Sequence, residues 1–225
     1  MNVTSSGLTR AAGAAAAVAG SIFIAVQVNH PAEAAFDTQT TEWVVRCAAK
    51  AVMCVLALAG ITGMYLRQHR QAGLLGLAGW VVFTLGYLIL FSVEIIAATV
   101  LPTLLDTNHG YVMDVVSAAA GGKPEGDIGA MQLVLNLAGA GYIIGGLLFG
   151  IALFRTGILA RWAAALLAVS TVSTATLAFL PDAFNRPLAV PEGVALIALG
   201  ISLWRNPSDA HVTEPAGAVL EPAAS

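Results

Sequence analysis

The stretch that decides the fold is residues 44–66, VVRCAAKAVMCVLALAGITGMYL, an almost continuous run of apolar side chains. At about 1.5 Å per residue, a helix of this length crosses the roughly 30 Å of hydrocarbon in a bilayer. Two cations, Arg46 and Lys50, lie one helical turn apart near its start. Charged side chains within a span are costly and normally face the interior of a helix bundle. The stretch therefore predicts a membrane-spanning helix with a polar face at one end.

Similar apolar runs follow along most of the chain. Of the 225 residues, 58% are hydrophobic and only 10% are charged, with a mean hydropathy of +0.82, which is outside the usual range of soluble domains. We therefore expect an all-α, multi-pass protein of the cell membrane, a polytopic bundle of six transmembrane helices. The six predicted spans lie near residues 9–28, 44–66, 74–100, 129–154, 158–180 and 187–204.

The distribution of basic residues predicts the orientation of the spans. Six arginines flank the spans on one side and four arginines or lysines on the other, and the turns LRQHRQ (66–71) and FRTGILAR (154–161) are basic without any acid. Because Lys and Arg are enriched in cytoplasmic loops, we expect both termini to be cytoplasmic. Residues 1–206 are then the six-helix transmembrane domain, and residues 207–225, rich in Pro, Glu and Ala, are predicted to be a disordered cytoplasmic tail.

The first span has an alternative interpretation as a signal peptide. Arg10 precedes an Ala-rich core, and PAEAAF (31–36) contains the small-residue pattern of a cleavage site. The apolar core is, however, about 18 residues long, whereas that of a usual signal is about 7–15. The length favours a helix that is retained.

The polar residues of the spans share one level in the predicted bundle. Counting about 1.5 Å per residue from the outer helix ends places both Lys50 and Glu94 roughly 10 Å below the outer surface. We expect these two residues to form an ion pair, because an unpaired charge at that depth is costly. Arg46 is nearer the interface and is expected to meet Glu192, Glu42 or a lipid headgroup.

Two interpretations of this polar level remain open. In the functional one, the polar side chains line a pocket open to the outside, assisted by the hydroxyl groups of STVSTAT (170–176). In the structural one, the same side chains hold the helices together through hydrogen bonds and ion pairs. The residues expected to bind a ligand in the functional interpretation are Gln27, His30, Arg46, Lys50, Glu94, Gln132, Asn136 and Glu192.

The strong signatures of catalysis and cofactor binding are lacking from the sequence. It contains no Walker loop, His-Glu-x-x-His, Gly-x-Ser-x-Gly or Cys-x-x-Cys. The basic residues are scattered, unlike those of a nucleic-acid-binding surface. Cys47 and Cys54 lie about 10 Å apart along one helix, too far for a disulfide. We therefore expect no cofactor, no metal site and no nucleic-acid partner, and enzymatic activity is not favoured.

Five stretches spread over nearly the whole chain resemble a group of uncharacterised bacterial six-span integral membrane proteins of the domain-of-unknown-function type. They are QVNHP (27–31), GITGMYLRQHRQAGLLGLAGW (60–80), VEIIAATVLP (93–102), GGLLFGIALFR (145–155) and LPDAFNRPLAVPEGVALIALGISLW (180–204). The resemblance implies the six-span topology and supplies no catalytic residues.

These patterns together favour a non-enzymatic membrane protein that binds a small or amphipathic molecule in an outward-facing polar pocket, as a transporter or sensor component. One alternative is an intramembrane enzyme acting on lipid or quinone, with Glu94 as proton donor or acceptor and Lys50 beside it. Another is a structural partner of a second membrane protein. Membrane lipid and a small-molecule ligand are the expected partners. The motifs Gly141-x-x-x-Gly145 and Gly146-x-x-x-Gly150 predict close helix packing, either within the chain or in a homo-oligomer.

Overall fold

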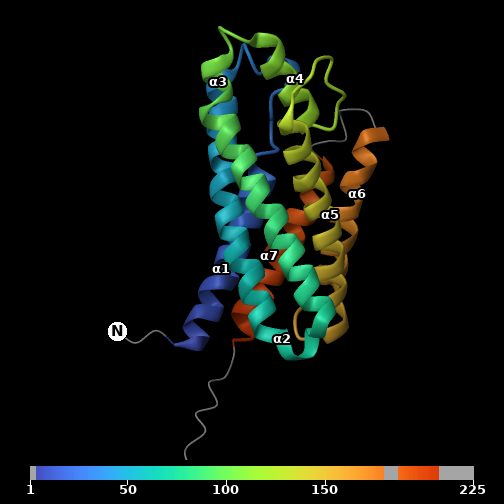
Figure 1. Ribbon diagram of the computed structural model, residues 1–225. Helices are drawn as coiled ribbons and strands as arrows, with labels where there is room; N and C mark the ends of the chain where they lie inside the picture. Colours follow the sequence, from blue (N-terminus) through green and yellow to red (C-terminus); the bar gives the residue numbers. More distant parts are fainter. Residues whose placement is uncertain (1–3, 180–186, 208–225) are drawn as a thin grey trace, which may run out of the picture.

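The computed structural model describes residues 4–179 and 187–207, and in this part of the chain all regular elements are helices (Figure 1). Four segments are long and apolar enough to cross a membrane, namely α1, α2, α5 and the segment ending with α7. The predicted tail lies outside the described residues, apart from its first position. In chain order the helices are α1 (Ser5–Ala25), η1 (Glu33–Ala35), α2 (Thr40–Thr99), α3 (Leu101–Leu104), α4 (His109–Ala119), α5 (Ala130–Thr156), α6 (Arg161–Ser173), η2 (Thr174–Phe179), η4 (Pro187–Ala189) and α7 (Val190–Arg205).

Helix α2 is folded back on itself. Its backbone is non-helical at Gln68 and at Gly73. Gly73 has a φ of 57°, a left-handed conformation that glycine adopts at no steric cost. The parts on either side, residues 40–67 (the first arm) and 74–99 (the second arm), lie antiparallel (Figure 1). The fold-back falls between the second and third predicted spans, 44–66 and 74–100, so these spans correspond to the two arms.

The predicted span at 158–180 departs from a regular helix. α6 ends at Ser173, and the chain continues as the 3-10 helix η2. The hydroxyls of Ser173 and Thr174 donate to the carbonyl oxygens three residues earlier, at 2.7 and 2.6 Å. Hydroxyl groups that bond to the local backbone compete with regular helix geometry. The hydroxyl-rich sequence therefore coincides with the end of the α-helix.

Helices α1 and α7 approach each other closely through glycine. They lie antiparallel, with Gly13 opposite Gly200 and Gly20 opposite Gly193. A Cβ atom on Gly13 would lie 2.6 Å from the carbonyl oxygen of Gly200, and one on Gly20 would lie 2.4 Å from that of Gly193. Small residues allow such approach of two backbones in membrane proteins. The first and last long helices of the described chain are thereby joined along their length.

The glycines of α5 pack the same helix against two neighbours. Gly141 and Gly145 face the second arm of α2, and a Cβ on Gly145 would lie 2.3 Å from the backbone nitrogen of Phe83. Gly146 and Gly150 face α6. Both predicted glycine motifs therefore act in packing within one chain.

The two ends of the bundle differ in charge. At one end the turn of α2, the α5–α6 turn and the end of α7 lie together, joined by a hydrogen bond from Arg67 Nε to the carbonyl oxygen of Asn206 (2.9 Å) and one from the Ala160 backbone N–H to Ser202 Oγ (3.1 Å). We call this the basic end, because among the described residues it holds arginines and no acid. Its arginines are Arg10, Arg67, Arg70, Arg155, Arg161 and Arg205.

A cap closes the opposite end of the bundle (Figure 1). It consists of residues 26–39 and 100–129, including α3 and α4. Within the cap, Val112 and Val115 of α4 are buried in a small apolar cluster with Phe36 and Trp43. This cluster holds the cap onto the start of the first arm.

The outward faces of the bundle carry large apolar side chains. Leu74 is 84% exposed, Val169 66% and Leu133 61%. Large apolar side chains that are exposed on several helices suit contact with lipid tails. Together with the four long apolar helices, these faces are features of an integral membrane protein.

Candidate ligand-binding cavity

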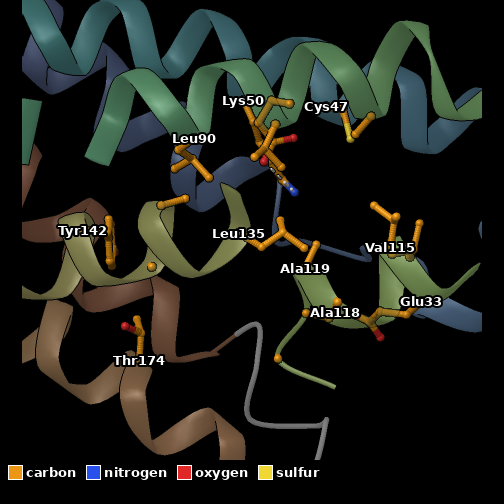
Figure 2. A pocket seen from close by; sticks show the side chains of 18 of the residues that line it. Glu33, Cys47, Lys50, Leu90, Val115, Ala118, Ala119, Leu135, Tyr142 and Thr174 are labelled. Atoms are coloured by element: carbon orange, nitrogen blue, oxygen red, sulfur yellow. Dashed lines mark ion pairs between the residues drawn. The ribbon is translucent and has the colours of Figure 1, made fainter. Parts of the chain in front are cut away.

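A cavity of about 610 Å³ lies between the helices on the side of the cap (Figure 2). Its walls come from α1, both arms of α2, α4, α5 and η2. Most of the lining is apolar, as at Met53, Leu90, Val115 and Leu135. The volume falls within the range of about 300–1,000 Å³ typical of small-molecule pockets, which are likewise mostly apolar with a few polar groups.

The central polar feature of the cavity is an ion pair between Lys50 on the first arm and Glu94 on the second. Lys50 Nζ lies 3.6 Å from Glu94 Oε1, and the two side chains are 15% and 10% exposed. Both residues line the cavity, and Figure 2 shows Lys50 reaching from α2 toward Leu135 and Ala119. The ion pair predicted from the sequence is therefore confirmed.

Helical periodicity explains how α2 supplies this wall. On the first arm the lining residues Trp43, Cys47 and Lys50 are separated by four and three positions, and on the second arm Glu94 and Ala97 are three apart. Side chains at such spacings lie on one face of a helix. Because the arms lie antiparallel, these faces meet around the cavity.

Four of the eight predicted binding residues line the cavity, namely Gln27, Lys50, Glu94 and Asn136. A fifth, Gln132, lies one turn from Asn136 on α5, and its Nε2 donates to Asn136 Oδ1 at 3.1 Å. The structure thus brings four of the predicted polar residues to the cavity lining and places a fifth beside one of them. Ligand binding by these residues stays a prediction.

Arg46 lies outside the cavity lining and binds the end of α1. Its guanidinium donates to the carbonyl oxygens of Val26 (2.7 Å), Val28 (3.0 Å) and Asn29 (3.1 Å), and to Glu42 Oε1 at 2.5 Å. Carbonyl groups at a helix C-terminus lack partners within the helix and carry partial negative charge. Of the three partners predicted for Arg46, Glu42 is the one that it contacts among the described residues.

His30 and Glu192 also lie away from the cavity lining. His30 Nδ1 is 2.9 Å from the carbonyl oxygen of Pro31, and its ring contacts Trp43 edge-on. Glu192, in the first turn of α7, is only 1% exposed, and its Oε1 accepts a hydrogen bond of 2.9 Å from the hydroxyl of Tyr87. The sequence analysis missed the role of Tyr87, whose spacing on the second arm resembles that of a core aromatic.

The hydroxyl groups of STVSTAT contribute little to the cavity. Among the described residues of that stretch, the cavity is lined by Thr174 and Ala175. Ser170 and Thr171 are buried and donate to the carbonyl oxygen of Leu167 at 3.1 and 3.0 Å. These hydroxyls therefore bond to the backbone of their own helix. The sequence analysis also missed polar lining residues at Glu33, Trp43 and Tyr142.

Comparison with known proteins adds no assignment. No family model, no curated protein and no solved structure matches the chain. The resemblance to bacterial six-span proteins therefore stays a prediction. Within residues 4–179 and 187–207, no group of three or more His, Cys, Asp or Glu side chains is placed to hold a metal ion.

An exposed ion pair joins the two parts of the cap. Asp37 Oδ2 lies 3.2 Å from His109 Nε2 at the start of α4. The hydrogen bond from His109 is the main cause that lowers the pKa of Asp37 below its ordinary value of 3.8. Since the pKa of this carboxyl is lower in the folded state, its stabilising effect is present above the unfolded value and is lost as the pH falls through the folded value.

We expect Asp37→Asn to lower the thermal unfolding midpoint of the purified protein slightly at about pH 5 and to have a smaller effect at about pH 2, because protonation of the carboxyl as the pH falls removes the ion pair. Thermal unfolding across this pH range measures the effect. Asp106→Asn is the matched control, because this exposed cap carboxyl has no ion pair within the described residues. An equal effect of Asp37→Asn at both pH values would contradict the assignment.

Proposed function

We propose that this chain is a six-span, multi-pass protein of the cell membrane that binds a small amphipathic molecule from the outer side, as a transporter or sensor component. Length and hydropathy alone identify four segments, with α2 counted once. The two arms of α2 would count as two spans, and α6 together with η2 would form a further one. Chemistry on the ligand is not part of the proposal.

The charge difference between the two ends supports the orientation. The basic end carries the turns without acids, and the described acids lie in the cap or in the half of the bundle nearest to it. Loops rich in Lys and Arg are retained in the cytoplasm. With the basic end inside, both ends of the described chain face the cytoplasm and the cavity faces outward.

The observation that carries the binding proposal is the cavity itself, a largely apolar space of about 610 Å³ with an ion pair on its wall. Charged residues within a span are costly to keep and typically mark substrate or ion pathways. An apolar body with a polar end matches both parts of this lining. This cavity lies in the half of the bundle nearest the cap, which fits a binding site better than a continuous pore.

Photo-crosslinking in vesicles tests this proposal directly. The probe is a monoacylglycerol with a diazirine in its acyl chain, added to protein reconstituted in phosphatidylcholine vesicles. We expect crosslinks at the cavity residues Leu90 and Leu135, in addition to background labelling of the lipid-facing Leu133. Mass spectrometry of the digested protein locates the labelled residues.

A cavity-filling variant provides the control. Gly139 lines the cavity, and a Cβ atom there would have nothing within 4 Å. Gly139→Phe should therefore remove the cavity crosslinks and leave the labelling of Leu133 intact. Leu137→Phe places the same phenylalanine side chain on the same helix at a half-exposed position and should change neither. Crosslinks confined to lipid-facing residues in the unaltered protein would overturn the proposal.

A further inference from the structure

Within the part of the chain that the structure describes, the ion pair in the cavity leaves most of its hydrogen-bonding capacity unused. Lys50 Nζ and Glu94 Oε1 are 3.6 Å apart, which is longer than a hydrogen bond of about 2.7–3.2 Å. Neither side chain makes a hydrogen bond to any other residue in the described ranges 4–179 and 187–207. An ammonium group has three donors, and a carboxylate accepts at about four positions. These donors and acceptors are available to whatever occupies the cavity.

A molecule in the cavity binds more favourably if it forms hydrogen bonds with Lys50 and Glu94. Two charges removed from water are offset by their mutual attraction only when further hydrogen bonds satisfy the remaining donors and acceptors. The side chains of Lys50 and Glu94 are 15% and 10% exposed, and both line the cavity. A molecule that replaces water beside the pair must therefore bring an acceptor for Lys50 and a donor for Glu94.

The spacing of the two charges restricts the charge of that molecule. An anionic head placed on Lys50 lies close to the Glu94 carboxylate, and a cationic head placed on Glu94 lies close to the Lys50 ammonium. Like charges at such separation disfavour a partner strongly, whereas complementary charges favour it. A head that carries one positive and one negative group matches the pair on both sides and is neutral overall.

The type of cation follows from the need for a donor. A primary ammonium can donate N–H hydrogen bonds to Glu94, whereas a trimethylammonium group has no N–H to donate. The walls at Met53, Leu90 and Leu135 are apolar and suit a hydrocarbon chain. Accepting the proposed function, we infer that the ligand is an amphiphile whose head carries a primary ammonium and an anionic oxygen, as in an ethanolamine lysophospholipid.

Three probes with the same diazirine-labelled acyl chain test the inference in phosphatidylcholine vesicles: lysophosphatidylethanolamine, lysophosphatidylcholine and lysophosphatidic acid. We expect the first to crosslink the cavity residue Leu135 about tenfold more efficiently than either of the others, because one hydrogen bond to a charged group changes affinity by about that factor. Equal labelling by all three, or stronger labelling by lysophosphatidic acid, would overturn the inference.

Variants of the pair identify the cause of the preference. In Glu94→Gln the preference for ethanolamine over choline should shrink to about twofold or less. In the double variant with Lys50→Met and Glu94→Leu, the three probes should label equally. A preference that persists in the double variant would show that it arises elsewhere.

Two further measurements distinguish a failure of this inference from a failure of the proposed function. If the neutral monoacylglycerol probe labels Leu135 but the three charged heads are not distinguished, only the inference about the head is wrong. If no probe labels the cavity, the proposed function is wrong as well. Excess soluble phosphoethanolamine should not suppress labelling by the lysophosphatidylethanolamine probe, and suppression would show that the site takes a water-soluble zwitterion in place of an amphiphile.

Discussion

Gly145→Ala is expected to destabilise the bundle by about 1–3 kcal/mol or more, the usual cost of overpacking a well-filled interior. A Cβ atom at this position would lie 2.3 Å from the backbone nitrogen and 2.4 Å from the Cα of Phe83. The contact is with backbone, so no side-chain rotation can relieve it and α5 must move away from the second arm. Thermal or denaturant-induced unfolding in one detergent measures the loss.

Gly139→Ala is the matched control for this prediction. Both glycines lie inside α5, so both substitutions gain about 1 kcal/mol of helix propensity. A Cβ at Gly139 has nothing within 4 Å, so the control should be neutral or slightly stabilising. The difference between the two variants isolates the steric contact from the backbone effect. Equal stability would mean that α5 does not approach the second arm as closely as described.

Much of the architecture could be predicted from local patterns in the sequence. Apolar length identified the long helices, and the basic turn between residues 66 and 71 located the fold-back of α2. The Lys50–Glu94 pair could be predicted because charges are scarce in the spans, so counting residues from the helix ends left few partners for each. Depth along a helix is a local quantity, which the sequence contains directly.

The direction of each polar side chain could not be predicted in the same way. Arg46 lies one turn from Lys50, yet it turns to the carbonyl groups at the end of α1, because that helix happens to end beside it. Among the described residues, Glu192 pairs with Tyr87 and with no cation. Both outcomes depend on which helices are neighbours and how they are rotated. The cavity itself depends on how the cap packs over the helix ends, which no single stretch of sequence specifies.

Lys50→Met and Glu94→Leu are each expected to destabilise the protein strongly, whereas the double variant is expected not to be destabilised. Each single change leaves one charge unpaired in the bundle, which typically costs about 3–5 kcal/mol for a buried pair. The lower end of that range is expected here, because the cavity of about 610 Å³ has room for several waters of about 30 Å³ each beside the remaining charge. Unfolding of the two single variants and the double variant in the same detergent measures the coupling.

The double variant distinguishes the two interpretations of the polar level. If the pair only holds the arms of α2 together, losing it should leave the protein less stable than the unaltered chain. We expect the opposite, a double variant that is as stable or more stable by up to about 1–4 kcal/mol, because apolar residues often stabilise a protein more than a buried ion pair without supporting hydrogen bonds. A pair that lowers stability where it stands has to be explained by what it binds, so this result, combined with loss of head-group preference in the crosslinking assay, would assign Lys50 and Glu94 to the ligand.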